Sequence, residues 1–462
     1  MGNQLIKSAG WLIQTFRSYI GDYEMNNVIG IRREDKSKWE RRVPLTPQKI
    51  RELRQNHTIE FHVQPSPVRI FLEPEFEQSG AKVQEDLSKA SVIFGVKEIP
   101  ANYFEPGKTY IFFAHVIKGQ AYNMAMLKRM MELKCNLIDY EKITDEKGRR
   151  LIFFGWHAGV VAMIDSLWTL GQRLAWEGIE NPFTGIRDTY TYDSLAAARK
   201  DVAAAGERIK TAGLPVAITP LIIGVAGYGN VGHGIQEILK DLPTVEIQPA
   251  DVAQVANDPN ASRHVVYRVT FKEEHSVELT TPGAKFDLQD YYQHPEKYRS
   301  CFEPYLPYLT VLMNSNYWED RYPRLVTKAQ IKKLFGNPSA PRLRVIGDAS
   351  CDIEGGVEVT TKATELGDPI YVYEPDTGAI AMGFKGRGPV ILAVDILPSE
   401  LPREASEYFS EILESFVPAI SLADFNVPFE KLVLPAEIKR AVILYHGELT
   451  PDFKYIAQYL KP

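Results

Sequence analysis

The chain has 462 residues and a formal net charge of −6, with 45% hydrophobic and 24% charged residues, which is typical of a globular protein of two or three domains. Charges of both signs are mixed along the chain, which argues against nucleic-acid binding, and no apolar run reaches the ~18 residues of a membrane span. The three cysteines, Cys135, Cys301 and Cys351, are far apart and follow no metal-binding pattern, so the sequence predicts no metal site and a reducing compartment.

The first 24 residues differ in composition from the rest of the chain. They include Lys7 and Arg17 but no acidic residue before Asp22. We interpret residues 1–24 as an N-terminal extension of a cytoplasmic protein. A transit peptide, which is basic, amphipathic and poor in acids, is the alternative and would place the protein in the mitochondrial matrix.

Short apolar runs and amphipathic segments alternate over residues 25–154. The sequence predicts strands at 28–34, 59–65, 91–96, 109–115 and 135–141. It predicts a helix at 46–55, with Thr46 as the N-cap and Pro47 in the first turn, and another at 121–133. Strands that alternate with helices form a mostly parallel sheet covered on both faces. We assign residues 25–154 to the first part of a substrate domain.

Residues 155–388 are predicted to form a dinucleotide-binding domain. This segment opens with a long, largely buried helix over 155–177, which we expect to lie between the domains. An alanine-rich helix follows at 195–209, and a second series of strands and helices starts at 220. Residues 389–462 are expected to return to the substrate domain with helices at 401–420 and 437–449. The predicted fold class is α/β, with two Rossmann-like, doubly wound parallel-sheet domains and a cleft between them.

A glycine-rich turn joins the apolar run LIIGVA to a predicted helix. Gly227, Gly229 and Gly232 have the G-x-G-x-x-G spacing. Such glycines let the backbone turn tightly and approach a pyrophosphate, while the helix N-terminus at Asn230 and Val231 presents free N–H groups to the phosphates. The next predicted strand, TVEIQPAD, lacks a clear terminal acid for the ribose. The motif therefore indicates a dinucleotide without deciding between NAD and NADP.

Charged and titratable side chains follow the strands of the first domain. Lys97 and Glu98 come after one strand, His115 ends the next, and Glu141 follows a third. The carboxyl ends of neighbouring parallel strands meet at one edge of the sheet, where ligands bind. Several arginines of the segment IRREDKSKWERR, Arg33 among them, follow the first strand and reach the same edge. Arginines beside a lysine, a histidine and carboxylates suit an anionic substrate that undergoes proton transfer.

Many motifs, in matching order, resemble one enzyme family. IRREDKSKWERRVPLTP, FGVKEIP, FFAHVIKGQ, LIDYEK, GRRLIFFGWHAG and GYGNVG together resemble the alanine dehydrogenase and transhydrogenase superfamily. NSNYWEDRYPRLVT, YYQHPEKYRS, GDASCDIEGGVE and VDILPSELPREAS are similar to the lysine–2-oxoglutarate reductase half of bifunctional aminoadipic semialdehyde synthases. The resemblance covers about residues 28–460. In the bifunctional enzymes, the glutamate-forming dehydrogenase would follow this segment.

The resemblance implies roles for individual residues. Lys97 and His115 match the acid–base groups of the family, and Glu98 and Glu141 match the acidic neighbours that tune them. Arg42 and Arg150 match arginines that hold substrate carboxylates, and Arg33 completes the predicted substrate-binding set. Asp352 matches an aspartate near the nicotinamide, and Asp348 is the alternative. The predicted cofactor-binding residues are these two aspartates with Gly227, Gly229, Asn230, Val231 and Gly232.

The resemblance implies an oxidoreductase that uses NADP(H), with NAD(H) as the alternative. The expected reaction condenses L-lysine with 2-oxoglutarate and reduces the imine to saccharopine, reversibly, in lysine metabolism. A homo-oligomer and a separate glutamate-forming saccharopine dehydrogenase are further candidate partners. Two other functions stay open: an alanine dehydrogenase-like amino-acid dehydrogenase, against which the additional Arg150 argues, and a non-catalytic dinucleotide-binding regulator, against which Lys97 and His115 argue.

Overall fold

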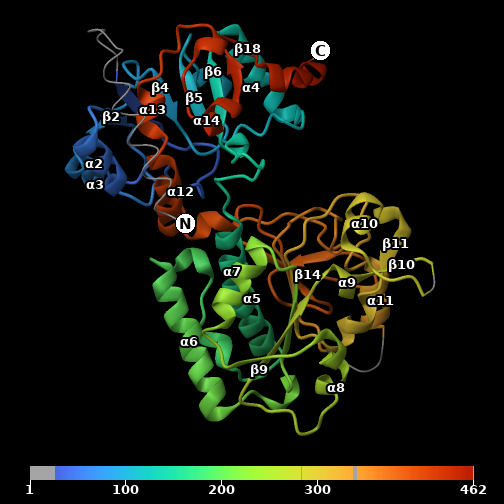
Figure 1. Ribbon diagram of the computed structural model, residues 1–462. Helices are drawn as coiled ribbons and strands as arrows, with labels where there is room; N and C mark the ends of the chain where they lie inside the picture. Colours follow the sequence, from blue (N-terminus) through green and yellow to red (C-terminus); the bar gives the residue numbers. More distant parts are fainter. Residues whose placement is uncertain (1–26, 282, 337–340, 461–462) are drawn as a thin grey trace. The chain divides into compact units, whose positions relative to one another are not determined.

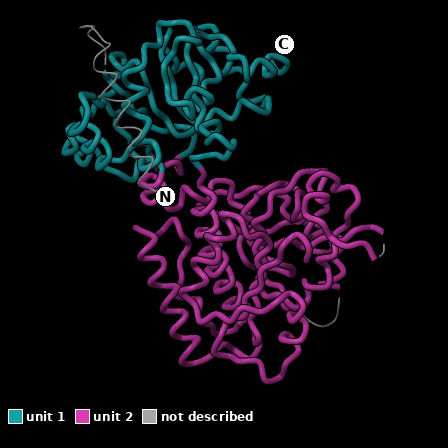
Figure 2. Tube along the Cα trace, viewed as in Figure 1, with its two compact units in different colours: residues 1–37, 43–152, 409–462 teal, residues 38–42, 153–408 magenta. Residues whose placement is uncertain are grey.

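The computed structural model describes residues 27–281, 283–336 and 341–460, and the chain divides into two compact units (Figure 2). Unit 1 comprises residues 1–37, 43–152 and 409–462, and unit 2 comprises residues 38–42 and 153–408. The N-terminal extension predicted over residues 1–24 lies outside the described residues. Within the described part of the chain, no helix is both long and apolar enough to cross a membrane.

Unit 1 contains an eight-stranded sheet in the order β18-β17-β6-β5-β4-β1-β2-β3 (Figure 1). Its strands are β1 (Val28–Ile31), β2 (Glu60–Val63), β3 (Lys82–Val83), β4 (Val92–Phe94), β5 (Thr109–Phe112), β6 (Asn136–Asp139), β17 (Val442–Tyr445) and β18 (Glu448–Leu449). The six strands β1 to β6 are parallel, and β17 is antiparallel to β6. The strand order reverses between β1 and β4, which makes the sheet doubly wound.

The helices of unit 1 cover this sheet. They are α2 (Pro47–Asn56), α3 (Glu73–Gln78), α4 (Ala121–Glu132), α13 (Val417–Ser421) and α14 (Ala436–Arg440). The predicted cap of the first is confirmed, because the side chain of Thr46 accepts a hydrogen bond from the Lys49 amide at 3.4 Å and Pro47 opens α2. Ile50 and Leu53 of α2 are buried, so the apolar face of this amphipathic helix packs against the core.

The tail of the chain differs from its predicted structure. The expected helix at 401–420 is divided into α12 (Pro402–Glu414) and α13, with Pro418 in the first turn of the second helix, where a missing N–H costs nothing. The helix expected at 437–449 is wrong, because only its first turn is helical in α14. The run VILY that follows begins with two β-branched residues and is buried, and it forms β17 beside β6.

Unit 2 contains a second eight-stranded sheet in the order β15-β14-β16-β13-β12-β7-β9-β8. Its strands are β7 (Ile222–Ala226), β8 (Thr244–Glu246), β9 (Val266–Phe271), β12 (Val311–Asn314), β13 (Val345–Asp348), β14 (Ile370–Tyr373), β15 (Ile380–Met382) and β16 (Val390–Leu392). All neighbours are parallel except at β14 and β15. Two mostly parallel, doubly wound sheets confirm the predicted fold class. The separate pair β10 (Val277–Leu279) and β11 (Tyr298–Ser300) is antiparallel.

The helices of unit 2 include the long predicted helix, now α5 (Gly155–Trp176). The others are α6 (Leu195–Ala212), α7 (Asn230–Leu239), α8 (Val252–Ala256), α9 (Glu273–Ser276), α10 (Leu288–Gln293) and α11 (Lys328–Phe335), together with the start of α12. α5 lies beside α7 (Figure 1), and a Cβ added to Gly159 or to Gly234 would collide with the backbone of the facing helix. These glycines therefore allow the two helices to pack closely. The position between the domains that we expect for α5 stays a prediction.

The return to unit 1 comes later in the chain than the expected residue 389. β16 lies between β13 and β14 in the second sheet, so residues 389–408 belong to unit 2. The run VIL at Val390–Leu392 is completely buried there. From residue 409 onward the chain belongs to unit 1.

Candidate active site

The loop that follows β4 is held by a carboxylate from the loop that follows β1. Glu34 is buried, and its two oxygens accept hydrogen bonds from the amides of Val96 and Lys97 at 2.8 and 2.9 Å. These strands are neighbours on either side of the point where the strand order reverses. Glu34 therefore fixes the backbone that presents Lys97 and Glu98 at the ligand-binding edge of the sheet. Sequence analysis did not assign a role to Glu34.

An ion-pair chain joins three strand ends of unit 1. Glu98 lies 2.8 Å from His115 Nδ1 through one oxygen and 2.6 Å from Lys36 Nζ through the other. Burial alone would raise the pKa of Glu98, but the hydrogen bonds to His115 and Lys36 outweigh burial and hold this pKa far below its usual range. An ionised Glu98 accepts the Nδ1–H of His115, which leaves the other ring nitrogen, Nε2, as the proton acceptor of the neutral imidazole.

The backbone at His115 is held in an unusual conformation. Its φ is +47°, a left-handed value that side-chain-bearing residues rarely adopt. Asn123 of α4, which is buried, donates from its side-chain amide to the carbonyl oxygens of Ala114 and His115 at 3.0 and 3.1 Å. The side chain of His115 is 27% exposed. Strain that neighbouring groups maintain is typical of functional sites.

The end of β6 contributes two carboxylates with different environments. Asp139 is fully buried, and burial together with Glu141 raises its pKa to about 7, while its oxygen accepts the Glu141 amide at 2.9 Å. Glu141 is paired with Arg150 at 3.3 Å. The structure thus brings these two predicted site residues together within unit 1.

The other predicted arginines lie elsewhere. Arg33 is paired with Glu85 at 2.7 Å, on the β2–β3 side of the sheet. Arg42 belongs to unit 2, where it is buried and donates from Nε and Nη2 to the two oxygens of Glu40 at 2.8 and 2.6 Å. The Arg42 guanidinium thus has its bidentate carboxylate partner within the chain.

The glycine-rich turn of unit 2 has the form that phosphate binding requires. Gly227 has φ +106°, and an added Cβ would lie 2.5 Å from Ser315 Oγ. An added Cβ on Gly232 would lie 2.6 Å from the Gly227 carbonyl oxygen, whereas one on Gly229 would meet nothing within 4 Å. Gly229 precedes α7, so the open space beside it adjoins a helix N-terminus, the kind of position that binds phosphates in dinucleotide-binding folds.

The strand next to β7 is not the one that follows β7 in the sequence. β9, not β8, lies next to β7, so TVEIQPAD forms the sheet edge. At the end of β9, Glu273 accepts hydrogen bonds from the hydroxyls of Tyr228 and Tyr292 at 3.0 and 2.8 Å. Tyr228 lies inside the glycine-rich turn. Glu273, missed by sequence analysis, opens α9 just after the strand next to β7 and is therefore the candidate for the acid that binds ribose hydroxyls in such folds.

The two candidate aspartates at the end of β13 differ in exposure. Asp348 is buried and accepts hydrogen bonds from Asn314, Ser350 and Thr360. Burial raises its pKa against the effect of these hydrogen bonds. Asp352 is exposed. Asp348 therefore supports the local backbone, and Asp352 is the candidate for contact with the nicotinamide.

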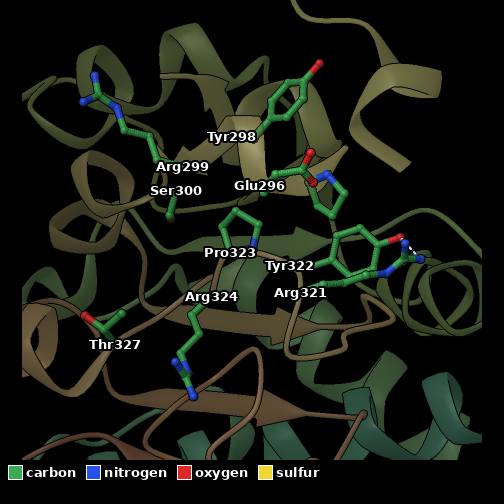
Figure 3. A pocket seen from close by; sticks show the side chains of 10 residues that line it. Glu296, Tyr298, Arg299, Ser300, Arg321, Tyr322, Pro323, Arg324 and Thr327 are labelled. Atoms are coloured by element: carbon green, nitrogen blue, oxygen red, sulfur yellow. Dashed lines mark hydrogen bonds between the residues drawn. The ribbon is translucent and has the colours of Figure 1, made fainter. Parts of the chain in front are cut away.

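A surface pocket of unit 2, about 410 Å³ in volume, is lined by none of the predicted site residues (Figure 3). Its three arginines are Arg299, Arg321 and Arg324. The first two are paired with Glu278 and Glu319, and the third donates to the carbonyl oxygens of Glu354 and Gly355. The side chains of Arg299 and Arg324 point away from each other in Figure 3. These arginines form no convergent anion site.

Comparison with known proteins gives one family match and several relatives. Residues 30–161 match the model of the alanine dehydrogenase/PNT N-terminal domain. Alpha-aminoadipic semialdehyde synthase of Arabidopsis thaliana is 37% identical over 94% of this chain, and the mitochondrial one of Bos taurus is 35% identical over 93%. The alignments cover 42% and 47% of those proteins, so the chain spans less than half of their length.

Shorter relatives and solved structures agree with this match. Saccharopine dehydrogenase (NAD(+), L-lysine-forming) of Neurospora crassa is 28% identical over 84% of this chain and 89% of its own length. An L-alanine dehydrogenase structure superposes with a TM-score of 0.58 at 15% identity over 94% of this chain, and a transhydrogenase from Sinorhizobium meliloti with 0.50 at 14% over 92%; both structures are covered over 100% of their own length. These superpositions show the shared fold. Over nearly its whole length the chain is thus similar to the alpha-aminoadipic semialdehyde synthases, and its residues 30–161 are similar to the alanine dehydrogenase/PNT N-terminal domain.

Proposed function

We propose that the protein is a nicotinamide-dependent oxidoreductase of lysine metabolism that condenses L-lysine with 2-oxoglutarate and reduces the product to saccharopine, reversibly. The names of its relatives support an oxidoreductase of this pathway. The observation that carries the finer proposal is the chain Lys36–Glu98–His115 at the strand ends of unit 1. It orients a histidine for proton transfer next to the loop that bears Lys97.

The ε-amine of lysine must be neutral to attack the ketone carbon of 2-oxoglutarate. We assign the acceptance of its proton to His115 Nε2, because Glu98 holds Nδ1. The resulting carbinolamine must lose water, and we assign the proton that its hydroxyl takes up to the ammonium of Lys97. When bound, a reduced nicotinamide dinucleotide would supply the hydride that reduces the imine. We assign the binding of a substrate carboxylate to Arg150, and this contact would help to hold the reacting carbon in place.

The glycine-rich turn is the proposed seat of the pyrophosphate, with the α7 N-terminus facing its charge. Glu273 bears on the choice between the two cofactors, because a 2′-phosphate would face its carboxylate. The preference for NADP(H) expected from sequence rested on the family resemblance and on the lack of a clear terminal acid in TVEIQPAD, but β9 and not TVEIQPAD lies next to β7. We therefore propose NAD(H) as the cofactor, with NADP(H) as the alternative.

An assay of NADH and NADPH oxidation with L-lysine plus 2-oxoglutarate tests the proposal. The expected result is turnover that requires both substrates and yields saccharopine. Turnover with pyruvate and ammonia instead would assign an alanine dehydrogenase-like activity. Dinucleotide binding without turnover on either pair would favour a regulator.

A further inference from the structure

Three acidic side chains from distant parts of unit 2 meet inside it. Asp165 lies on α5, Asp188 precedes the 3₁₀ turn Thr189–Thr191, and Glu400 ends the 3₁₀ turn Leu397–Glu400. One carboxylate oxygen of each lies within 4.8 Å of those of the other two. Asp165 and Glu400 are 0% and 1% exposed, and Asp188 is half-buried. None of the three belongs to the site described above.

Several oxygens of this cluster have no hydrogen-bond partner. Asp165 accepts hydrogen bonds from the amide and hydroxyl of Thr189 through Oδ1, but its Oδ2 is buried without a partner. Asp188 Oδ1 and both carboxylate oxygens of Glu400 are likewise buried without a partner in good hydrogen-bond geometry, although Asp165 and the Tyr190 amide lie close enough to affect the pKa of Glu400. Glu400 in particular is 1% exposed and directs an unpartnered oxygen toward both aspartates. A buried carboxylate in this state is costly unless something positive compensates it.

The chain itself supplies little compensation. Among the residues that the structure describes, no lysine or arginine forms an ion pair with Asp165, Asp188 or Glu400. Burial raises the pKa of each of the three, and the neighbouring carboxylates add to the increase for Asp188 and Glu400. Two devices can neutralise such a group: protons shared between the carboxylates, or a bound cation.

We propose that Asp165, Asp188 and Glu400 bind one hard divalent cation, Ca²⁺ or Mg²⁺, inside unit 2. Four unpartnered carboxylate oxygens form an all-oxygen donor set, which these cations prefer over softer metals. The half-buried Asp188 lies on the exposed side of the cluster. The cation ties α5 to the turns around residues 188–191 and 397–400, and α5 in turn packs on α7 behind the glycine-rich turn. Sequence spacing shows no sign of this site because its ligands come from three distant segments.

Calorimetric titration of the chelator-treated full chain at pH 8, with CaCl₂ and MgCl₂ in separate arms, tests the proposal. We expect one equivalent of at least one cation to bind. At about a hundred times the dissociation constant, the bound cation should raise the melting temperature by about 5 °C. Absence of binding heat and of any melting shift with both cations would overturn the proposal and assign the compensation to shared protons.

Two variants and a matched control localise the site. Glu400→Gln keeps the shape and removes one charged ligand, so cation affinity should fall at least about tenfold. Asp188→Asn, at the more exposed ligand, should do the same if Glu400→Gln fails to fold. Glu407→Gln, an exposed acid on α12 outside the cluster, should bind as the wild type does. Undiminished binding in both cluster variants would place the cation elsewhere and contradict the proposal.

Discussion

The carboxyl-terminal edges of the two parallel sheets differ in the chemistry that they present. In unit 1 the edge presents charged side chains, with Glu98 between Lys36 and His115. In unit 2 the corresponding edge presents glycine backbone, with open space above Gly229. Both lie where the strand order reverses. Topology therefore selects the location of a site, and the residues that follow each strand select its chemistry.

The largest expected effect tests the charged edge. His115→Gln and Lys97→Met should each lower kcat by about 10²–10⁴, since each removes a general acid–base group. Loss in the double variant should be far smaller than the product of the single losses, because the two groups act as a unit. Steady-state kinetics over a range of pH measures both. His446→Gln is the matched control, an exposed histidine of unit 1 that also has a positive φ. Near-normal kcat in both single variants would show that Lys97 and His115 have no catalytic role.

The glycine edge should respond through binding. Gly229→Val places a branched side chain in the space that we assign to the pyrophosphate, so dinucleotide binding by calorimetry should be lost while circular dichroism is unchanged. Gly229→Ala is the graded control and should bind with intermediate affinity. If Gly229→Val bound the dinucleotide with unchanged affinity, the pyrophosphate would not bind at this turn.

Two arginines sharpen the difference between supporting and binding roles. Arg42 is buried against Glu40, so Arg42→Ala should lower the free energy of unfolding by about 3 kcal/mol because it strands a buried carboxylate. Arg150 is 37% exposed, and Arg150→Ala should raise the KM for 2-oxoglutarate with little effect on stability. Chemical denaturation and substrate kinetics of both variants separate the roles. A higher substrate KM for Arg42→Ala at unchanged stability would reverse the assignment.

The carboxylate of Glu98 gives a stability effect of known sign. Its pKa is depressed in the folded protein, so its contribution is present above the unfolded pKa of about 4.3 and is lost as pH falls through the folded value. Glu98→Gln should therefore cost about 2 kcal/mol at pH 7 and less below pH ~4. Glu400 has a raised pKa, so the same substitution there should be neutral or stabilising in chelator-treated protein at pH 8. If denaturant unfolding showed that both substitutions change the free energy of unfolding in the same direction, then the neighbouring groups would not decide how these two carboxylates affect stability.

The smallest effect concerns the cofactor. Glu273→Gln removes the charge that would repel a 2′-phosphate, so the ratio of kcat/KM for NADPH to that for NADH should rise by about tenfold. Glu246→Gln, on the edge strand β8, is the control and should leave this ratio unchanged. A ratio that changed only in the control would assign the contact with the ribose to Glu246 instead of Glu273.

Local signals in the sequence predicted much of this structure, and long-range pairing explains what they missed. The Thr46 cap, the glycine spacing and the strand-end positions of Glu98 and His115 depend on neighbours in the chain, and each of these elements was placed correctly. Two features depend on partners far away in sequence: β9 and not β8 pairs with β7, and VILY forms a strand beside β6. Glu34 was missed for the same reason, because its hydrogen bonds reach across 62 and 63 residues.

The position of β17 has a consequence for synthesis on the ribosome. This strand covers the edge of β6 and is made some 300 residues after it, once unit 2 has been translated. We therefore expect unit 2 to reach its folded state while the nascent chain still exposes β6 as an open strand edge. Such edges invite pairing with other chains, so this interval is when the nascent protein should depend most on chaperones.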